Sequence, residues 1–236
     1  MTRLFVVTHN ICHMGLNPFD RTELFPDRTY RNGYEAHTVE TMRQRWQALY
    51  SSFSADLIGL QEYFPWFALA HTCRTEDEVF APFGYTVSDG GHGLALAAKY
   101  PAEPVYETSF APISERRQQK YRVTVGTRQI AVFNSHPMPR SPETRQQEYA
   151  ALIRAFQSEQ TFIAFGDYNA VEMEEYACFR EAGFPMANSG FITTESRHPC
   201  DNIVVSPNIR IEHVEMLDRE LTVSDHAPLL AELLIP

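Results

Sequence analysis

The feature that most constrains the fold of this chain is a short apolar run, residues 161–169 (TFIAFGDYN), which ends in Gly166, Asp167 and Asn169. A run of this length bounded by polar residues predicts a buried strand that delivers a carboxylate and an amide to a sheet edge. The two-residue period of a strand predicts that Asp167 and Asn169 point the same way. Such a pair suits a site that binds a hard cation or activates water while donating to an anionic oxygen. An ordinary turn is the alternative, because these residue types are common in turns.

Other predicted strands also carry polar residues at an end. Strand patterns at 4–8, 55–62 and 129–134 run into polar residues, another begins at residue 200, and a turn at 223–229 precedes the last strand. A glutamate at the end of a buried strand is costly unless it is paired or binds a cation. Each position alone also fits a turn, but six separate sites make coincidence a poor explanation. In chain order they carry Asn10, Glu62, His136, Asp167 with Asn169, Asp201, and Asp225 with His226.

Helices are expected between these strands. Met42, Trp46, Leu49 and Phe53 recur at helical spacing, which indicates an amphipathic helix with a buried stripe. Further helices are predicted after Ser141, at 172–182 before Gly183, and at a capping box at 75–78, and Gly126 and Thr127 predict a hairpin turn. Residues 16–37 are polar and irregular, which is long for a connection and suggests a lid or a substrate-facing loop.

Composition limits the class of protein. The chain has 236 residues, a hydrophobic fraction of 44% and no evident linker or repeat, which predicts one compact domain over residues 1–236. The short apolar N-terminal run does not suit a signal peptide, and no later stretch suits a membrane span, so a soluble, cytoplasmic monomer without integral membrane association is expected. Four cysteines without metal-type spacing are expected to be reduced and mostly buried.

Charge limits the substrate. The net charge of −10 argues against a broad phosphate-binding surface, because duplex nucleic acid is held mainly by many lysine and arginine contacts. A small phosphate ester, or a nucleic acid held locally with the help of a cation, remains compatible with this charge.

The ordered set of motifs resembles the endonuclease/exonuclease/phosphatase family, the deoxyribonuclease-like metal-dependent phosphohydrolases. The matching motifs are Asn-Ile at Asn10, Leu-Gln-Glu at 60–62, a Gly-x-Ala-x-x-x-Lys-x-Pro-like strand at 93–101, Ser-His at His136, Gly-Asp-Tyr-Asn at 166–169, Asp-Asn-Ile at 201–203 and Ser-Asp-His at 224–226. Gly-Asp-x-Asn and Ser-Asp-His are the specific ones. The resemblance implies a four-layered α/β sandwich, DNase I-like, in which two packed, mostly antiparallel sheets are flanked by helices and the site lies at one rim.

The resemblance also implies roles. Glu62 would be a principal ligand of a divalent cation, Mg²⁺ or Mn²⁺, with Asn10 nearby and a contribution from Asp225. Asp167 would orient or deprotonate the attacking water or assist the leaving group, and Asn169 would hold a phosphate oxygen. The histidines at 136 and 226 would contact phosphate, and Asp201 would orient His226. Which residue is general base and which general acid stays open.

Departures from the family pattern bear on the substrate. Cys12 stands where abasic-site endonucleases carry a carboxylate or amide, and the short segment between Asp167 and Asp201 leaves little room for DNA-gripping insertions. We therefore favour a phosphodiesterase or phosphatase that acts on a small or lipid-type phosphate ester. An endonuclease or exonuclease is the second hypothesis. A catalytically silent binding module is the third, and it is disfavoured because every polar position of the motif set is filled.

Overall fold

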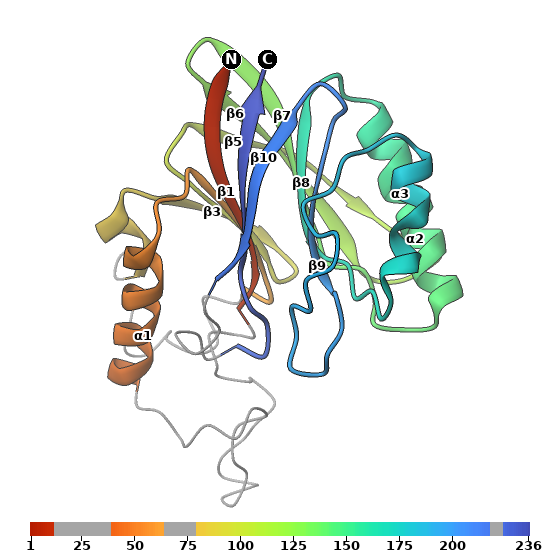
Figure 1. Ribbon diagram of the computed structural model, residues 1–236, viewed down its shortest axis with the longest axis horizontal. Coiled ribbons are helices and arrows are strands. Elements are labelled where there is room, and N and C mark those ends of the chain that lie inside the picture. Colours follow the sequence, from red (N-terminus) through yellow and green to blue (C-terminus); the bar gives the residue numbers. More distant parts are fainter. Residues whose placement is uncertain (12–38, 64–78, 218–223) are drawn as a thin grey trace, which may run out of the picture.

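The structure, a computed structural model, describes residues 1–11, 39–63, 79–217 and 224–236. Their strands form two sheets that pack face to face, and helices cover both outer faces (Figure 1). The predicted four-layered sandwich of mostly antiparallel sheets is therefore confirmed. Residues 16–37 and the capping box at 75–78 lie outside the described residues.

The first sheet has six strands in the order β10-β11-β1-β2-β4-β3. All of its pairs are antiparallel except β1 with β2. Thr2 pairs with Ile235, so the two chain ends lie side by side in Figure 1. The bounds are β1 Thr2–Asn10, β2 Leu57–Gln61, β3 Thr86–Gly91, β4 Leu94–Ala98, β10 Arg210–Met216 and β11 Leu229–Ile235.

The second sheet has five strands in the order β5-β6-β7-β8-β9, and only β7 and β8 run parallel. The predicted hairpin joins β6 to β7: Val125 pairs with Arg128, and Gly126 adopts a φ of 63° in the turn. The bounds are β5 Ala102–Ser109, β6 Arg117–Val125, β7 Arg128–Ser135, β8 Phe162–Asp167 and β9 Asp201–Val205.

The strand directions explain why the polar ends meet. Parallel neighbours end at the same edge of a sheet, as β1 with β2 and β7 with β8 do here. Strand β9 runs antiparallel to β8 and pairs its first residue, Asp201, with the last residue of β8, Asp167. Four strand ends, those of β1, β2, β7 and β8, and the start of β9 are thus brought to the rim of the sandwich.

Apolar side chains from both sheets fill the space between them, and Leu4, Val6, Ile163 and Phe165 are fully buried there. Gly59 is required by this packing, because a Cβ atom at that position would lie 2.4 Å from the Cβ of Phe165. Burying apolar surface contributes roughly 25 cal/mol per Å², which makes this layer the main source of stability.

A buried polar network joins the two sheets directly beneath the rim. The Asn134 amide of β7 donates to the backbone oxygens of Leu60, at 2.8 Å, and Ala95, at 2.9 Å, in the other sheet. Gln61 in turn donates to the Asn134 side-chain oxygen at 2.7 Å. Because buried polar groups must be paired, these bonds hold the strand ends of the two sheets in fixed relative positions.

The helices follow the predicted patterns with one difference. Helix α1, Val39–Ser52, buries Trp46 and Leu49 against the first sheet, and Phe53 packs just beyond its end; the side chain of Met42 lies outside the described part. Helix α2, Pro142–Gln157, begins after Ser141, whose hydroxyl accepts a hydrogen bond from the Thr144 amide. The helix predicted at 172–182 starts instead as a 3₁₀ turn, η4 Met173–Tyr176, before α3, Ala177–Glu181; another such turn is η3 Ala81–Phe83.

The predictions for the cysteines and for a membrane span can be compared with the structure only over the described residues. Cys178 and Cys200 are free thiols, whereas Cys12 and Cys73 lie outside those residues. Among the described helices, none has the length and apolar character needed to cross a membrane.

Candidate active site

A cavity of about 580 Å³ opens at the rim where the polar strand ends meet. Six of the eight predicted site residues line it: Glu62, His136, Asp167, Asn169, Asp225 and His226. The remaining two, Asn10 and Asp201, are buried behind it and hydrogen-bond to Asp167 and His226, respectively. The fold therefore gathers the whole predicted set into one place.

Asp167, the last residue of β8, is the hub of the site. Its Oδ2 atom accepts a hydrogen bond from the Asn10 amide at 2.8 Å, and the Nε2 atoms of His136 and His226 lie 3.3 and 3.7 Å from it. Its other oxygen accepts from the Asn169 backbone amide at 2.8 Å. Burial alone would raise the pKa of this carboxyl, but the charge of His226 and the hydrogen bonds from His136 and Asn10 hold the pKa well below its usual value. Asp167 is thus a buried, ionised hydrogen-bond acceptor.

Asn169 reaches the site by a different route from the one predicted. Strand β8 ends at Asp167, and Asn169 has a φ of 54°, so strand alternation does not set its direction. The Asp167 side chain instead forms a turn with the Asn169 amide, and the Asn169 side chain donates to the Pro137 backbone oxygen at 2.8 Å. Asp167 and Asn169 thus form a turn and also line the cavity. One N–H of the Asn169 side-chain amide remains available to a ligand.

Glu62 follows β2 and also has a left-handed backbone, with a φ of 54°. This conformation costs a residue with a Cβ atom about 1–2 kcal/mol, so the surrounding structure must enforce it. Asn10 donates to the Glu62 carboxylate at 3.2 Å, and the glutamate is half-buried in the cavity wall. Backbone strain at a residue that lines a cavity is typical of functional sites.

His226 and Asp201 form the tightest pair of the site. The Nδ1 atom of His226 lies 2.7 Å from Asp201 Oδ2, and Asp201 is fully buried at the start of β9. Burial alone would lower the pKa of His226, but the charges of Asp201 and Asp167 raise it to about 10. His226 is therefore an imidazolium at neutral pH. It lies three residues before β11 and joins Thr194 in an isolated bridge, so it does not open that strand directly.

The family generally depends on a divalent metal, and the donors present suit a hard cation. Glu62 and Asp225 line the same cavity, both are partly exposed, and the Asn10 amide contacts Glu62. Carboxylate and amide oxygens are the ligands that Mg²⁺ and Mn²⁺ prefer.

A second acidic group among the described residues fits a metal less well. The ligand atoms of Asp167, Asp201 and His226 lie within 4.8 Å of one another. However, Nδ1 of this histidine already bonds to Asp201, and the two carboxylates keep the ring protonated. Asp201 is fully buried and already bonded to the ring, whereas Glu62 and Asp225 are partly exposed to the cavity, so that pair is the better candidate for a metal centre.

The sequence patterns did not reveal Arg116, which also lines the cavity. Its Nη1 atom lies 3.2 Å from Nδ1 of His136. Because a guanidinium can only donate, Nδ1 accepts and Nε2 of His136 carries the proton that faces Asp167. Arg116 stands just before β6 without a motif around it. No pattern in the sequence pointed to the other residues of the wall either, which are Pro139, Arg145, Val171, Thr194, Glu195, Ser196, His198 and Cys200.

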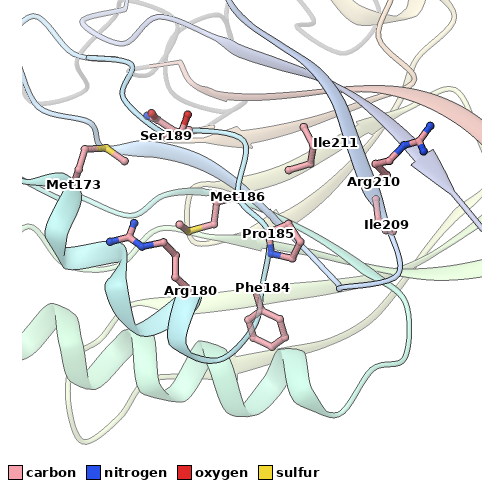
Figure 2. Close-up of a pocket in the computed structure, with 10 residues that line it drawn as sticks. Met173, Arg180, Phe184, Pro185, Met186, Ser189, Ile209, Arg210 and Ile211 are labelled. Atoms are coloured by element: carbon pink, nitrogen blue, oxygen red, sulfur yellow. The ribbon is translucent and has the colours of Figure 1, made fainter.

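A larger cavity, of about 700 Å³, lies away from the rim, between α3 with the loop that follows it and the start of β10 (Figure 2). Its described lining is mostly apolar, with Phe184, Met186 and Ile211, and includes Arg180 and Arg210 but no carboxylate or imidazole. Its described lining therefore offers no group for acid–base chemistry or metal binding, in contrast to the rim cavity.

Solved structures of other proteins share this fold. Among solved structures, an endonuclease/exonuclease/phosphatase from Bacteroides vulgatus superposes with a TM-score of 0.68 at 19% identity and full coverage of both chains, 100% and 100%. ANGEL2, a 2′,3′-cyclic phosphatase in complex with adenosine-2′,3′-vanadate, has a TM-score of 0.70 at 15% identity and covers 98% of this chain and 95% of its own. D. rerio TDP2 complexed with single strand DNA product has a TM-score of 0.65 at 15% identity, with 99% and 100% covered. The chain has no significant match among curated proteins.

These likenesses establish a DNase I-like fold, the architecture of metal-dependent phosphohydrolases. The sequence profile of the Endonuclease/Exonuclease/phosphatase family matches residues 14–226, and the chain therefore belongs to that family of phosphoester hydrolases.

Proposed function

We propose that the protein is a divalent-metal-dependent phosphodiesterase or phosphatase that cleaves a small or lipid-type phosphate ester by in-line attack of an activated water. One observation carries the proposal. A single rim cavity holds a carboxylate hub, two imidazoles and a pair of partly exposed carboxylates, supplied by four separate segments of the chain. Phosphoryl transfer needs positioned water and stabilised charge on the phosphate oxygens more than covalent help.

In this proposal Glu62 and Asp225 hold Mg²⁺ or Mn²⁺, with the Asn10 side-chain oxygen close by. The bound cation supplies positive charge to a phosphate oxygen and relieves the repulsion between the carboxylates. Asn169 donates its remaining side-chain N–H to a second phosphate oxygen, and His136 donates from Nε2.

Asp167 and His226 have different roles in the proposed reaction: Asp167 orients the attacking water, and His226 donates a proton. A carboxylate whose pKa is held low is a weak base, so Asp167 accepts a hydrogen bond from the attacking water and orients it. His226 carries a proton held by Asp201 and can donate it toward the leaving oxygen as that bond breaks.

The proposal is tested with a substrate panel. Bis-p-nitrophenyl phosphate, p-nitrophenyl phosphate, plasmid DNA, single-stranded RNA and phospholipids are each incubated with Mg²⁺, Mn²⁺ or EDTA. We expect turnover of at least one small ester with a cation and none with excess EDTA. Equal turnover in EDTA would exclude the metal-dependent mechanism.

A nuclease is the second candidate, and two structural relatives support it. TDP2 is complexed with a single strand DNA product and ANGEL2 with an adenosine-2′,3′-vanadate, so this fold holds nucleotides in other proteins. The net charge of −10 weighs against long duplexes in this chain. Nanomolar binding to duplex DNA that weakens steeply with salt would reverse the order of the two candidates.

A further inference from the structure

A smaller cavity of about 310 Å³ adjoins the rim cavity, and Arg116 and His136 line both. The smaller cavity is otherwise basic in character, with His92 and Arg117 in its wall. Its one described acid, Glu115, is mostly exposed and pairs with Arg140 at 3.7 Å. In a protein with a net charge of −10, this is a local concentration of positive charge next to the proposed reaction centre.

Arg116 has no carboxylate partner among the residues that the structure describes. Its side chain contacts the Met138 sulfur at 3.1 Å and Nδ1 of His136 at 3.2 Å. By contrast, Arg145 forms two bonds with Glu175, at 2.7 and 2.8 Å. A half-buried guanidinium with five donors, held by a thioether and one imidazole nitrogen, has both charge and donors left for an anion.

The position of Arg116 is held by a buried acid. Its backbone amide donates to Ser114 Oγ at 3.1 Å, and the Ser114 hydroxyl donates to Glu148, which is fully buried on α2. The other Glu148 oxygen accepts from the Met138 amide at 2.9 Å. One buried carboxylate thus ties together the segments that carry Arg116 and Met138, so the wall between the two cavities is fixed before any ligand binds.

We propose that the smaller cavity is a subsite for a second phosphate, so that the substrate is an ester that carries another phosphate group beyond the one cleaved. The inference rests on the proposed function, because it assigns the scissile phosphate to the rim cavity. Arg116 presents its fork from the shared wall, and the planar guanidinium matches phosphate oxygens in a two-bond geometry. The second phosphate belongs either to a nucleotide or to a small bisphosphate without a base.

His92 provides a matched test, because it lines only the smaller cavity, is exposed, and has a φ of 51°. Asparagine and aspartate both tolerate a left-handed backbone and have nearly the same shape, so His92→Asn and His92→Asp differ by one negative charge. Neither change touches a residue placed in the catalytic machinery.

The kinetic readout uses the p-nitrophenyl ester of thymidine 5′-phosphate with and without a 3′-phosphate. We expect the wild type to prefer the doubly phosphorylated ester, and the kcat/KM ratio of the two esters to be about tenfold lower in His92→Asp than in His92→Asn. The ester without the 3′-phosphate should react equally with both variants. An equal ratio in the two variants would overturn the subsite. Failure of the wild type to cleave either ester with Mg²⁺ or Mn²⁺ would count against the proposed function instead.

A binding titration tests the subsite even if neither ester is cleaved. Thymidine 3′,5′-bisphosphate is titrated into each variant in EDTA, and we expect about tenfold weaker binding to His92→Asp than to His92→Asn, whereas identical affinities would reject the proposal. The same titration with a propanediol bisphosphate distinguishes a nucleotide from a small bisphosphate without a base as the source of the second phosphate. A similar affinity for both identifies a phosphate-only subsite, and a loss of binding identifies a nucleotide as the source.

Discussion

His226 Nδ1 lies 2.7 Å from Asp201 Oδ2 across a sequence separation of 25 residues, and this bond sets the charge of the ring. Asp201→Asn removes the carboxylate that helps raise the pKa of His226 to about 10. The imidazolium is present below that pKa and lost above it, so the alkaline limb of the rate profile should move to lower pH. We expect kcat to fall more than KM rises, because the charge acts on the transition state.

The measurement is a pH profile of kcat and kcat/KM for Asp201→Asn, with circular dichroism to show that the variant is folded. An unchanged profile in a folded variant would mean that Asp201 only caps its strand and would remove His226 from the mechanism.

Glu62→Gln should raise the metal concentration needed for half-maximal activity by about tenfold or more, because an amide replaces a charged ligand of a hard cation. The residue is half-buried, and glutamine has nearly the same size and shape as glutamate. Activity is titrated against Mg²⁺ and Mn²⁺ in the parent and the variant. A variant that needs no more metal than the parent would show that Glu62 is not a ligand.

Glu175→Gln should destabilise the fold by about 3 kcal/mol at neutral pH, because it leaves the buried Arg145 without its charged partner. Burial raises the pKa of Glu175, but Arg145 and two backbone amides outweigh it, and the net pKa is below the usual value of 4.5. The unfolded chain therefore takes up this proton first as the pH falls below 4.5, and stability is lost in that range.

Denaturant unfolding of parent and variant from pH 7 to pH 3 tests this directly. The stability difference between them should shrink as the pH falls below 4.5. Glu181→Gln, on the exposed part of α3, serves as the control and should show no such trend. If the stability difference between the parent and Glu175→Gln stays constant with pH, the stabilisation depends on the shape of the side chain and not on its charge.

Gly59→Ala should destabilise the protein by about 1–3 kcal/mol, because the new Cβ atom would lie 2.4 Å from Phe165 in the layer between the sheets. Gly190→Ala is the matched control, since no heavy atom lies within 4 Å of its new Cβ atom and its φ is not positive. The control should be neutral or slightly stabilising. Thermal unfolding of both variants checks the prediction, and equal midpoints would show that the sheets can separate at no cost.

Much of the fold followed from local sequence because its signals are local. The two-residue period of the strands, the Ser141 cap and the Gly126 turn each depend on interactions within a few residues. The same holds for the helix predicted at 172–182, where the structure differs only in the 3₁₀ character of the first turn. The candidate residues were predictable as a set because each stands at a strand end or in a turn close to one.

The relations between these residues were decided only by the tertiary structure. The sequence by itself determined that Asp167 ends a strand and that Asp201 begins one, but their pairing across β8 and β9 depends on the register of two strands more than thirty residues apart. The backbone at Glu62 is left-handed because surrounding contacts enforce it, against the preference of glutamate, whereas Asn169 is of a residue type that tolerates this conformation. Arg116 has no local motif, and its contact with His136 arises from the antiparallel pairing of β6 with β7. The charge state of a titratable side chain likewise depends on its burial and on charged neighbours that are distant in the sequence. Neither of these produces a periodic pattern in the sequence.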